Sequence, residues 1–337
     1  VKQFIQHGIA TKQTDTTGQL YIEGLETVDI SEKTLSEQLV TCIHQSKRAG
    51  YALEKWEFLK DYKYSVIFTC DDFSSTLKKA KKIIPLENTY ENDYLYTSFV
   101  KPVAYSMDGY YFLKFNLAYA AIHPLTQEEF LTKYPFLVVF HEKGELIEFR
   151  FDVLKRVFLS DKKEPTIYSN LIAEMSDYFK EHFECDLIPL NLDFMVNVCK
   201  RDENVKLIAQ SMKLPNGGNA QLDVGNNQEY ILPFIGELRS LLNDNQVELE
   251  KVPDFREALE QFMFEMEEMS DYPWIELLWE NEIKTRSNRV KFVFNYMNKS
   301  YCLIQYYYSN VLIGMERINY VIEYIVNHRN DDTTQNE

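Results

Sequence analysis

The sequence predicts an α+β protein whose antiparallel sheets are built from hairpins and covered by packed helices. Two observations support this. Four pairs of aromatic-rich apolar segments flank short turn sequences, and helical periodicity recurs between them. The chain of 337 residues has 45% hydrophobic and 26% charged residues, as folded proteins do. Its 23 tyrosines and 22 phenylalanines favour strands and well-filled cores.

Each predicted hairpin has its own turn signal. The strand pairs are 98–105 with 110–121, 136–140 with 145–151, 192–199 with 205–213, and 289–296 with 301–308. The first pair flanks Asp108-Gly109, a dipeptide typical of tight turns. In the second pair, apolar side chains alternate with Glu148 and Arg150, which predicts a strand with one face in solvent.

Helices are expected between these hairpins. Residues 31–48 begin with a capping residue and space Leu35, Leu39 and Ile43 four residues apart. Helical spacing also predicts helices at 167–183 and 311–326, and a further one that carries Phe255, Leu259, Phe262, Met266 and Met269.

The length of the chain favours two domains. The best boundary is Ser160–Pro165, a charged stretch that ends in proline. It would divide the chain into a β-rich α+β domain at 1–160 and an α+β domain with more helix at 161–337.

Charge and cysteine usage restrict the class of protein. Fifty-two acidic residues against 36 basic ones give a formal charge of -16, which opposes nonspecific binding to nucleic acid and to anionic membranes. No apolar run is long enough to predict a membrane span. The five cysteines are dispersed, which favours a reducing cytoplasm. The abundance of Asn, Lys, Ile, Tyr and Phe is typical of AT-rich coding sequences, as in bacteria and mobile elements.

One pattern suggests catalysis. Glu174 lies on a predicted helix, Asp193 on the next strand, and Gln210 and Lys213 on the strand after it. This order resembles the restriction-endonuclease-like nucleases, which have a helix Glu, a strand Asp and an (Asp/Glu/Gln)-x-Lys. The resemblance implies Mg²⁺ held by carboxylates, with Asp193 as a metal ligand and the lysine at the attacking water. Here the spacing is Gln-x-x-Lys, which places Gln210 and Lys213 on opposite faces of a regular strand.

Two weaker motifs have ordinary explanations. The glycine-rich stretch 214–219, with 225–227 beyond it, could wrap a phosphate, but it lacks the ending of a P-loop and is more typical of a connecting loop. His182 and Cys185 have HxxC spacing, which supplies fewer ligands than a zinc site needs.

Residues 254–282 contain ten acidic residues and a single basic one, Arg256, together with Trp274 and Trp279. An acidic amphipathic helix pair with exposed aromatics would suit a basic protein partner. The interpretation favoured by helical spacing is that the Phe, Met and Trp side chains face the core and the acids face solvent.

These observations favour a non-catalytic cytoplasmic interaction protein without a cofactor. It would be a subunit of a larger assembly, of the kind found in bacterial phage defence or mobile elements, with a protein partner that is basic. The alternatives are a metal-dependent nuclease with an intact or degraded site, for which alone a nucleic-acid partner is expected, and a small-molecule sensor at the glycine-rich loop. Whether the protein is an enzyme stays open at this stage.

Overall fold

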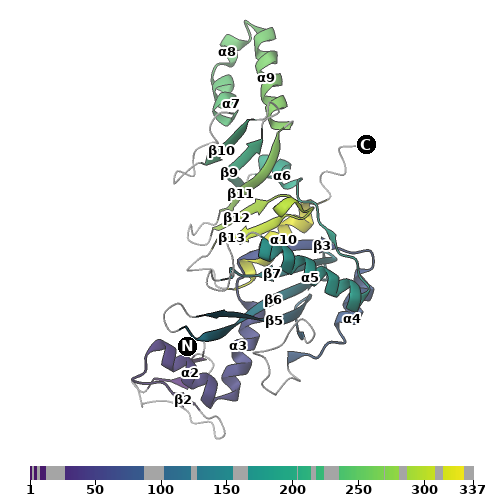
Figure 1. Cartoon of the computed structure of the whole chain (residues 1–337). Coiled ribbons are helices and arrows are strands. Elements are labelled where there is room, and N and C mark those ends of the chain that lie inside the picture. The colour runs from purple at the N-terminus through teal and green to yellow at the C-terminus, as the bar shows by residue number, and fades with distance from the viewer. Residues whose placement is uncertain are drawn as a thin grey trace.

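The described part of the chain in the computed structural model is built around one antiparallel sheet of eleven strands, which confirms the α+β class (Figure 1). The structure describes residues 1, 4–5, 8–12, 27–86, 102–122, 127–154, 166–202, 204–213, 218–223, 235–268, 270–280, 287–307 and 314–329. A separate two-stranded sheet lies near the N-terminus.

The strands of the large sheet come from both halves of the chain. They are β3 (Tyr64–Thr69), β4 (Val103–Met107), β5 (Tyr110–Ile122), β6 (Glu129–His141), β7 (Leu146–Phe151), β8 (Ile188–Pro189), β9 (Val205–Lys213), β10 (Asn219–Asp223), β11 (Asp271–Trp279), β12 (Asn288–Val293) and β13 (Leu303–Tyr306). Their order is β10-β9-β11-β12-β13-β3-β7-β6-β5-β4, with β8 also paired to β3. β1 (Ala10–Thr11) and β2 (Val28–Asp29) form the small sheet.

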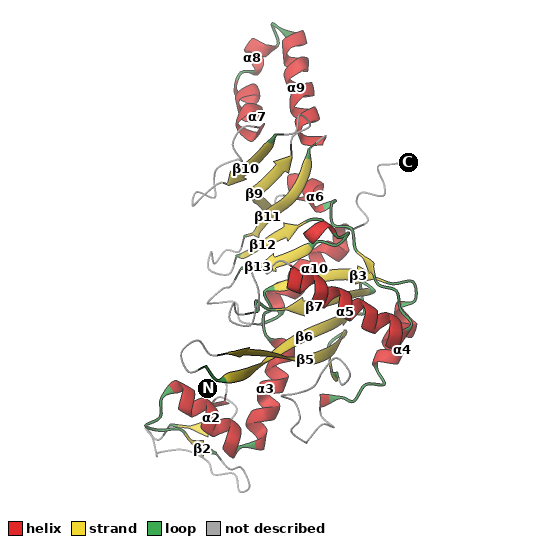
Figure 2. Ribbon diagram, viewed as in Figure 1, coloured by secondary structure: helices red, strands yellow, loops and turns green. Residues whose placement is uncertain are grey.

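The helices lie on both faces and at both ends of the sheet (Figure 2). They are α2 (Leu35–Gln45), α3 (Lys47–Leu59), α4 (Phe73–Ala80), α5 (Thr166–Phe183), α6 (Met195–Arg201), α7 (Ile235–Asp244), α8 (Gln246–Leu249), α9 (Pro253–Glu268) and α10 (Glu316–His328). A short 3₁₀ helix, η4 (Tyr296–Asn298), joins β12 to β13.

The sheet separates two apolar cores. One contains side chains of α3, α6 and α10, and the other contains side chains of α4 and α5. Successive residues of β3 alternate between them, since Ile67 belongs to the first core and Val66 and Phe68 belong to the second. We name the two sides of the sheet the α10 face and the α5 face.

Three of the four predicted hairpins are confirmed. β4 pairs with β5, β6 with β7, and β12 with β13. Asp108 and Gly109 both have positive φ, at 43° and 82°, as the tight turn between β4 and β5 requires.

The third hairpin is wrong. The segment predicted as its first strand forms α6 and the turn before it, so β9 pairs with β10 and β11 instead. An apolar run as short as 194–199 has no periodicity that distinguishes a buried strand from a buried helix.

The solvent-facing side predicted for 145–151 is also wrong. Glu148 and Arg150 are fully buried on the α10 face, as deeply as the apolar side chains between them. The alternation correctly places the two sets of side chains on opposite faces, but the polar set is covered by helices.

The predicted helix at 31–48 is split into two helices. α2 begins after Thr34, whose hydroxyl and backbone N–H form a capping box with Glu37, and it ends before the extended Ser46. Its regularly spaced apolar residues Leu35, Leu39 and Ile43 are exposed, with Leu35 71% exposed.

The division of the chain into two domains is not confirmed. The boundary Ser160–Pro165 lies outside the described residues, as does most of the glycine-rich stretch. β3, from the first half, pairs with β13, from the second. Among the described helices, none combines the length and the hydropathy that a membrane span requires.

Candidate functional site

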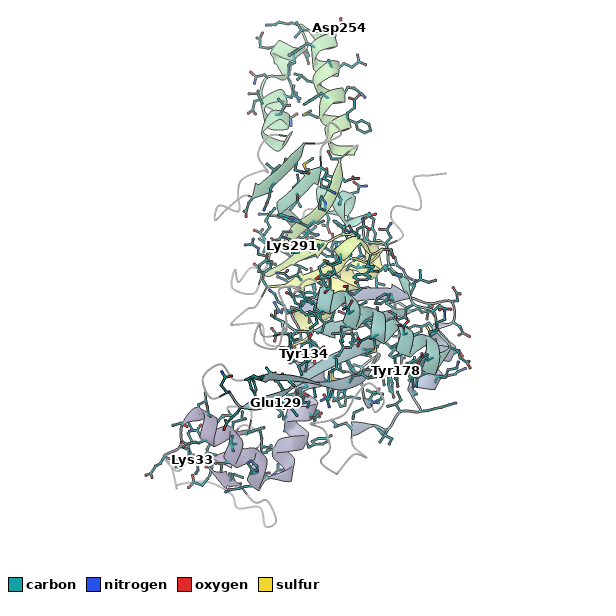
Figure 3. All side chains as sticks on the ribbon, in the orientation of Figure 1. Lys33, Glu129, Tyr134, Tyr178, Asp254 and Lys291 are labelled. Carbon is teal, nitrogen blue, oxygen red and sulfur yellow. The ribbon has the colours of Figure 1, made fainter. Side chains whose placement is uncertain are left out.

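A helical arm projects from one end of the large sheet (Figure 1). We define the arm as residues 235–268, which form α7, α8 and α9. A small apolar cluster attaches it to the sheet, where Met212 of β9 packs against Leu242 and Met263. Figure 3 shows Asp254 at the tip of the arm, at the opposite end of the molecule from Lys33, which precedes α2.

Large apolar side chains of the arm face solvent. Phe255, Phe262 and Phe264 are 59%, 44% and 59% exposed. Leu241, Val247 and Val252 are exposed as well. Exposed aromatic residues that gather on one element are typical of binding surfaces. For the phenylalanines of α9, the interpretation that they face the core is therefore wrong.

The two tryptophans of this region do not belong to a helix. Trp274 and Trp279 lie on β11, and Trp279 is buried in the core of the α10 face. The side chains of Met266 and Met269 lie outside those that the structure describes.

The arm is acidic. Its described acidic side chains are Asp244, Glu248, Glu250, Asp254, Glu257, Glu260 and Glu265, and its described basic ones are Lys251 and Arg256. Each basic side chain pairs within the arm, Lys251 Nζ with Glu248 Oε2 at 2.6 Å and Arg256 Nε with Glu260 Oε1 at 2.8 Å. Because both described cations are already paired, the remaining described carboxylates leave the arm with a net negative charge.

A second exposed apolar surface lies on α2. Leu35, Leu39, Val40 and Ile43 are spaced along one side of this helix and are exposed. The arm and α2 therefore offer contact surfaces at two ends of the molecule (Figure 3).

Ionisable side chains also converge inside the protein, beneath α3. Lys114 of β5 and Lys133 of β6 contact Glu54 and Glu57 of α3, with Nζ–Oε2 distances of 2.7 Å from each lysine to Glu57. Lys114 is fully buried. Burial by itself would raise the pKa of Glu57, but the two lysines outweigh it and lower that pKa. The four charges balance one another, as buried charges must.

A second buried network lies on β6 and β7. Arg150 Nε and Nη2 donate to Glu148 Oε2 at 2.8 and 2.7 Å, and Nη2 also donates to Asn319 Oδ1 at 2.7 Å. His141 Nε2 lies 2.8 Å from the same Glu148 oxygen. Among the described residues, Glu148 Oε1 and Arg150 Nη1 find no hydrogen-bond partner. Both networks join helices to strands by largely buried charges, an arrangement that positions elements of the fold.

The acid sensitivity of the fold follows from the second network. Burial lowers the pKa of His141 against the opposing effect of Glu148, so the native state holds this imidazole neutral. Burial would raise the pKa of Glu148, but Arg150 and His141 lower it. His141 and Glu148 both bind protons more weakly in the folded state than in the unfolded state. Their contribution to the free energy of unfolding is therefore complete near neutral pH and is lost as the pH falls below about 6.5.

We expect His141→Gln to flatten this dependence. Glutamine can still donate a hydrogen bond to Glu148 but cannot take up a proton. The free energy of unfolding, measured by urea titration between pH 7.5 and 5, should fall less steeply in the variant, by at most about 1.4 kcal/mol per pH unit. Equal slopes for the two proteins would assign the acid sensitivity to other groups.

The residues of the nuclease pattern are placed separately. Glu174 is exposed on α5, which packs on the α5 face. Asp193 is exposed in the turn before α6 and not on a strand, and the residues that flank it, Leu192 and Phe194, join the core of the α10 face. The helix glutamate and the aspartate are thus associated with opposite faces of the sheet.

The other two residues of the pattern lie on β9. Gln210 is buried, with Nε2 3.0 Å from Met212 Sδ, whereas Lys213 is exposed at the end of the strand. β9 is four strands away from β3, or roughly 19 Å at the usual strand spacing. Among the described residues, no group of three or more His, Cys, Asp or Glu side chains is placed to hold a metal ion. The Mg²⁺ assignment to Asp193 therefore gains no geometric support.

No protein-family model and no curated protein sequence matches the chain.

Proposed function

We propose that this protein is a non-catalytic interaction subunit whose arm docks onto another protein. The single observation behind the proposal is the exposure of Phe255, Phe262 and Phe264 on a projecting, acidic helix pair. Phenylalanine is costly to leave in water, and an isolated helix pair gains nothing from aromatic side chains that face away from its own core.

The chemistry of the arm indicates the partner. Its surface combines bulky apolar side chains with carboxylates that lack an ion-pair partner among the described residues. A complementary partner surface carries Lys or Arg around an apolar groove, since opposite charges steer association and apolar contacts supply most of the affinity. α2 is available as a second contact surface, which suits a subunit placed between two components of an assembly.

The setting of the assembly is proposed from the sequence. None of the five cysteines, all of which the structure describes, is in a disulfide, which suits a reducing cytoplasm. The composition suits a bacterial defence or mobile-element system, and we propose that context for the search for a partner.

The decisive variant is Phe255→Ser/Phe262→Ser/Phe264→Ser. We expect it to lose at least about tenfold in affinity for the partner, because truncating one buried aromatic anchor at an interface costs about 2 kcal/mol. The full chain, tagged, would be cross-linked in cells that express its native neighbours, and the captured protein would be quantified by mass spectrometry and then titrated in purified form.

A matched control replaces exposed apolar residues elsewhere, in Ile84→Ser/Ile122→Ser/Leu131→Ser, all three of them exposed by more than half. This control should bind as the wild type does, and binding of the wild type should weaken with added salt. Equal capture by the arm variant and the wild type, or no partner at all, would refute the docking role of the arm.

A further inference from the structure

Two cysteines that are distant in the sequence lie together at one edge of the α5 face. Cys70 directly follows β3, and Cys185 follows α5 by two residues. The chain then returns to pair β8 with β3 in antiparallel register, Thr69 with Ile188 and Phe68 with Pro189. This pairing holds the segment around Cys185 beside the end of β3.

The surroundings of the pair are well anchored. Thr69 Oγ1 donates to Ile188 O at 3.3 Å, and Cys185 N donates to Phe179 O at 3.3 Å. Lys79 Nζ of α4 donates to Phe183 O at 2.7 Å and pairs with Glu184 at 2.6 Å. Three elements, β3, α4 and the end of α5, therefore fix the position of the two sulfur atoms.

The thiols interact directly. The Cys70 and Cys185 side chains pack in the same core, within hydrogen-bonding reach of each other, and Thr76, at the first turn of α4, lies beside both. Cys70 is half-buried, whereas Cys185 is buried. The β3–β8 pairing and the shared core bring two cysteines from separate chain segments together, and proximity without a large backbone movement is the main requirement for a disulfide.

We propose that Cys70 and Cys185 form a redox-active thiol pair that a hydroperoxide converts into a reversible disulfide. This inference is independent of the docking role of the arm, which lies at the far end of the sheet (Figure 1).

The chemistry proceeds in two steps. The hydrogen bond from Cys70 lowers the pKa of Cys185 to about 7 against the opposing effect of burial, so a substantial share of this thiol is thiolate at neutral pH. The same contact raises the pKa of Cys70 above its ordinary value. The Cys185 thiolate attacks one peroxide oxygen, the O–O bond breaks, and the leaving oxygen takes up a proton to give water or an alcohol.

The resulting Cys185 sulfenic acid then reacts with Cys70. The Cys70 sulfur bonds to the Cys185 sulfur, the S–O bond breaks, and the hydroxyl leaves as water with the Cys70 proton. Two thiols are oxidised by two electrons in total, and one hydroperoxide is reduced. A dithiol reductant reverses the reaction by thiol–disulfide exchange.

The test uses the folded full chain, reduced and then freed of reductant. The protein is treated with a small excess of hydrogen peroxide, blocked with N-ethylmaleimide, and digested without reduction for peptide mapping. We expect most molecules to contain a linked peptide pair with Cys70 and Cys185, and dithiothreitol should remove this link. If both cysteines instead carry the maleimide after peroxide treatment, the proposal is overturned.

Three variants define the roles of the two thiols. In Cys70→Ser, the Cys185 sulfenic acid cannot be resolved and should be trapped by dimedone. In Cys185→Ser, Cys70 should stay unmodified at the same peroxide dose. Cys199→Ser, in the core of the α10 face, should form the disulfide as the wild type does. Dimedone labelling of Cys70 rather than Cys185 would contradict the proposed order, and labelling of neither would contradict the pair itself.

Discussion

Arg150→Met is expected to destabilise the protein by about 3–5 kcal/mol, because it leaves the Glu148 carboxylate buried without its cation. Arg150 and Glu148 are both fully buried, and the arginine also carries the hydrogen bond to Asn319 of α10. The methionine fills much of the same volume, so the loss reflects the uncompensated charge more than a cavity. Urea-induced unfolding at pH 7.5 measures it.

Two further measurements test whether the uncompensated charge of Glu148 causes the loss of stability in Arg150→Met. The deficit of Arg150→Met should shrink as pH falls, since Glu148 can then take up a proton and become neutral. The double variant Glu148→Leu/Arg150→Met should recover most of the lost stability, because a buried ion pair replaced by apolar side chains is often neutral. As a control, Arg256→Met removes an arginine from an exposed pair on the arm and should leave the unfolding midpoint unchanged. A deficit that is independent of pH and persists in the double variant would point to lost packing instead.

The features of the fold that the sequence predicts correctly are local ones. The turn at Asp108-Gly109 needs positive φ at both positions, and these two residues are among the few that adopt it readily. The periodic helix α5 is found within one residue of its predicted bounds, because its signal lies within a few turns of chain, and α10 ends two residues past its predicted end but begins five residues later than predicted.

One of the missed features depends on partners distant in the sequence, and another depends on a local turn. Alternation in β7 shows that Glu148 and Arg150 share a face, but only the positions of α3 and α10 decide that this face is buried. Asp193 fails as a strand residue because Asn191 Oδ1 accepts its backbone N–H in a local turn that leads into α6. No pattern near Glu148 reports the helices that cover it, whereas Asn191 is a local signal for the turn at Asp193.

The exposure of the phenylalanines on α9 also could not be predicted from local spacing. Spacing along α9 indicates an apolar stripe, and a stripe usually faces a core. Here α9 belongs to a projecting helix pair whose cluster with the sheet is small, so Phe255 and Phe262 stay exposed while Met263 is buried. The acidic composition of this segment was visible in the sequence, whereas its projection from the sheet was not.

The charge cluster beneath α3 gives the second large expected effect. Lys114 lies between Glu54 and Glu57 with no exposure to solvent, and it also donates to the Glu54 carbonyl oxygen at 3.2 Å. Lys114→Met would leave two buried carboxylates to share Lys133, and we expect a loss of about 3–5 kcal/mol. Because two like charges in one buried site cannot both stay ionised cheaply, one of the glutamates should take up a proton, and the pKa of the pair should rise.

Because these charges are coupled, a second substitution should restore stability only in the Lys114→Met background. Adding Glu54→Gln to Lys114→Met restores the balance of one carboxylate to one lysine and should recover a large part of the lost stability at pH 7.5, whereas Glu54→Gln in the wild-type background should destabilise the protein. Opposite signs of the same substitution in the two backgrounds form a double-mutant cycle that isolates the Lys114–Glu54 interaction from packing. If Glu54→Gln destabilises both backgrounds equally, the two residues act independently, and the buried charges under α3 are not a single coupled network.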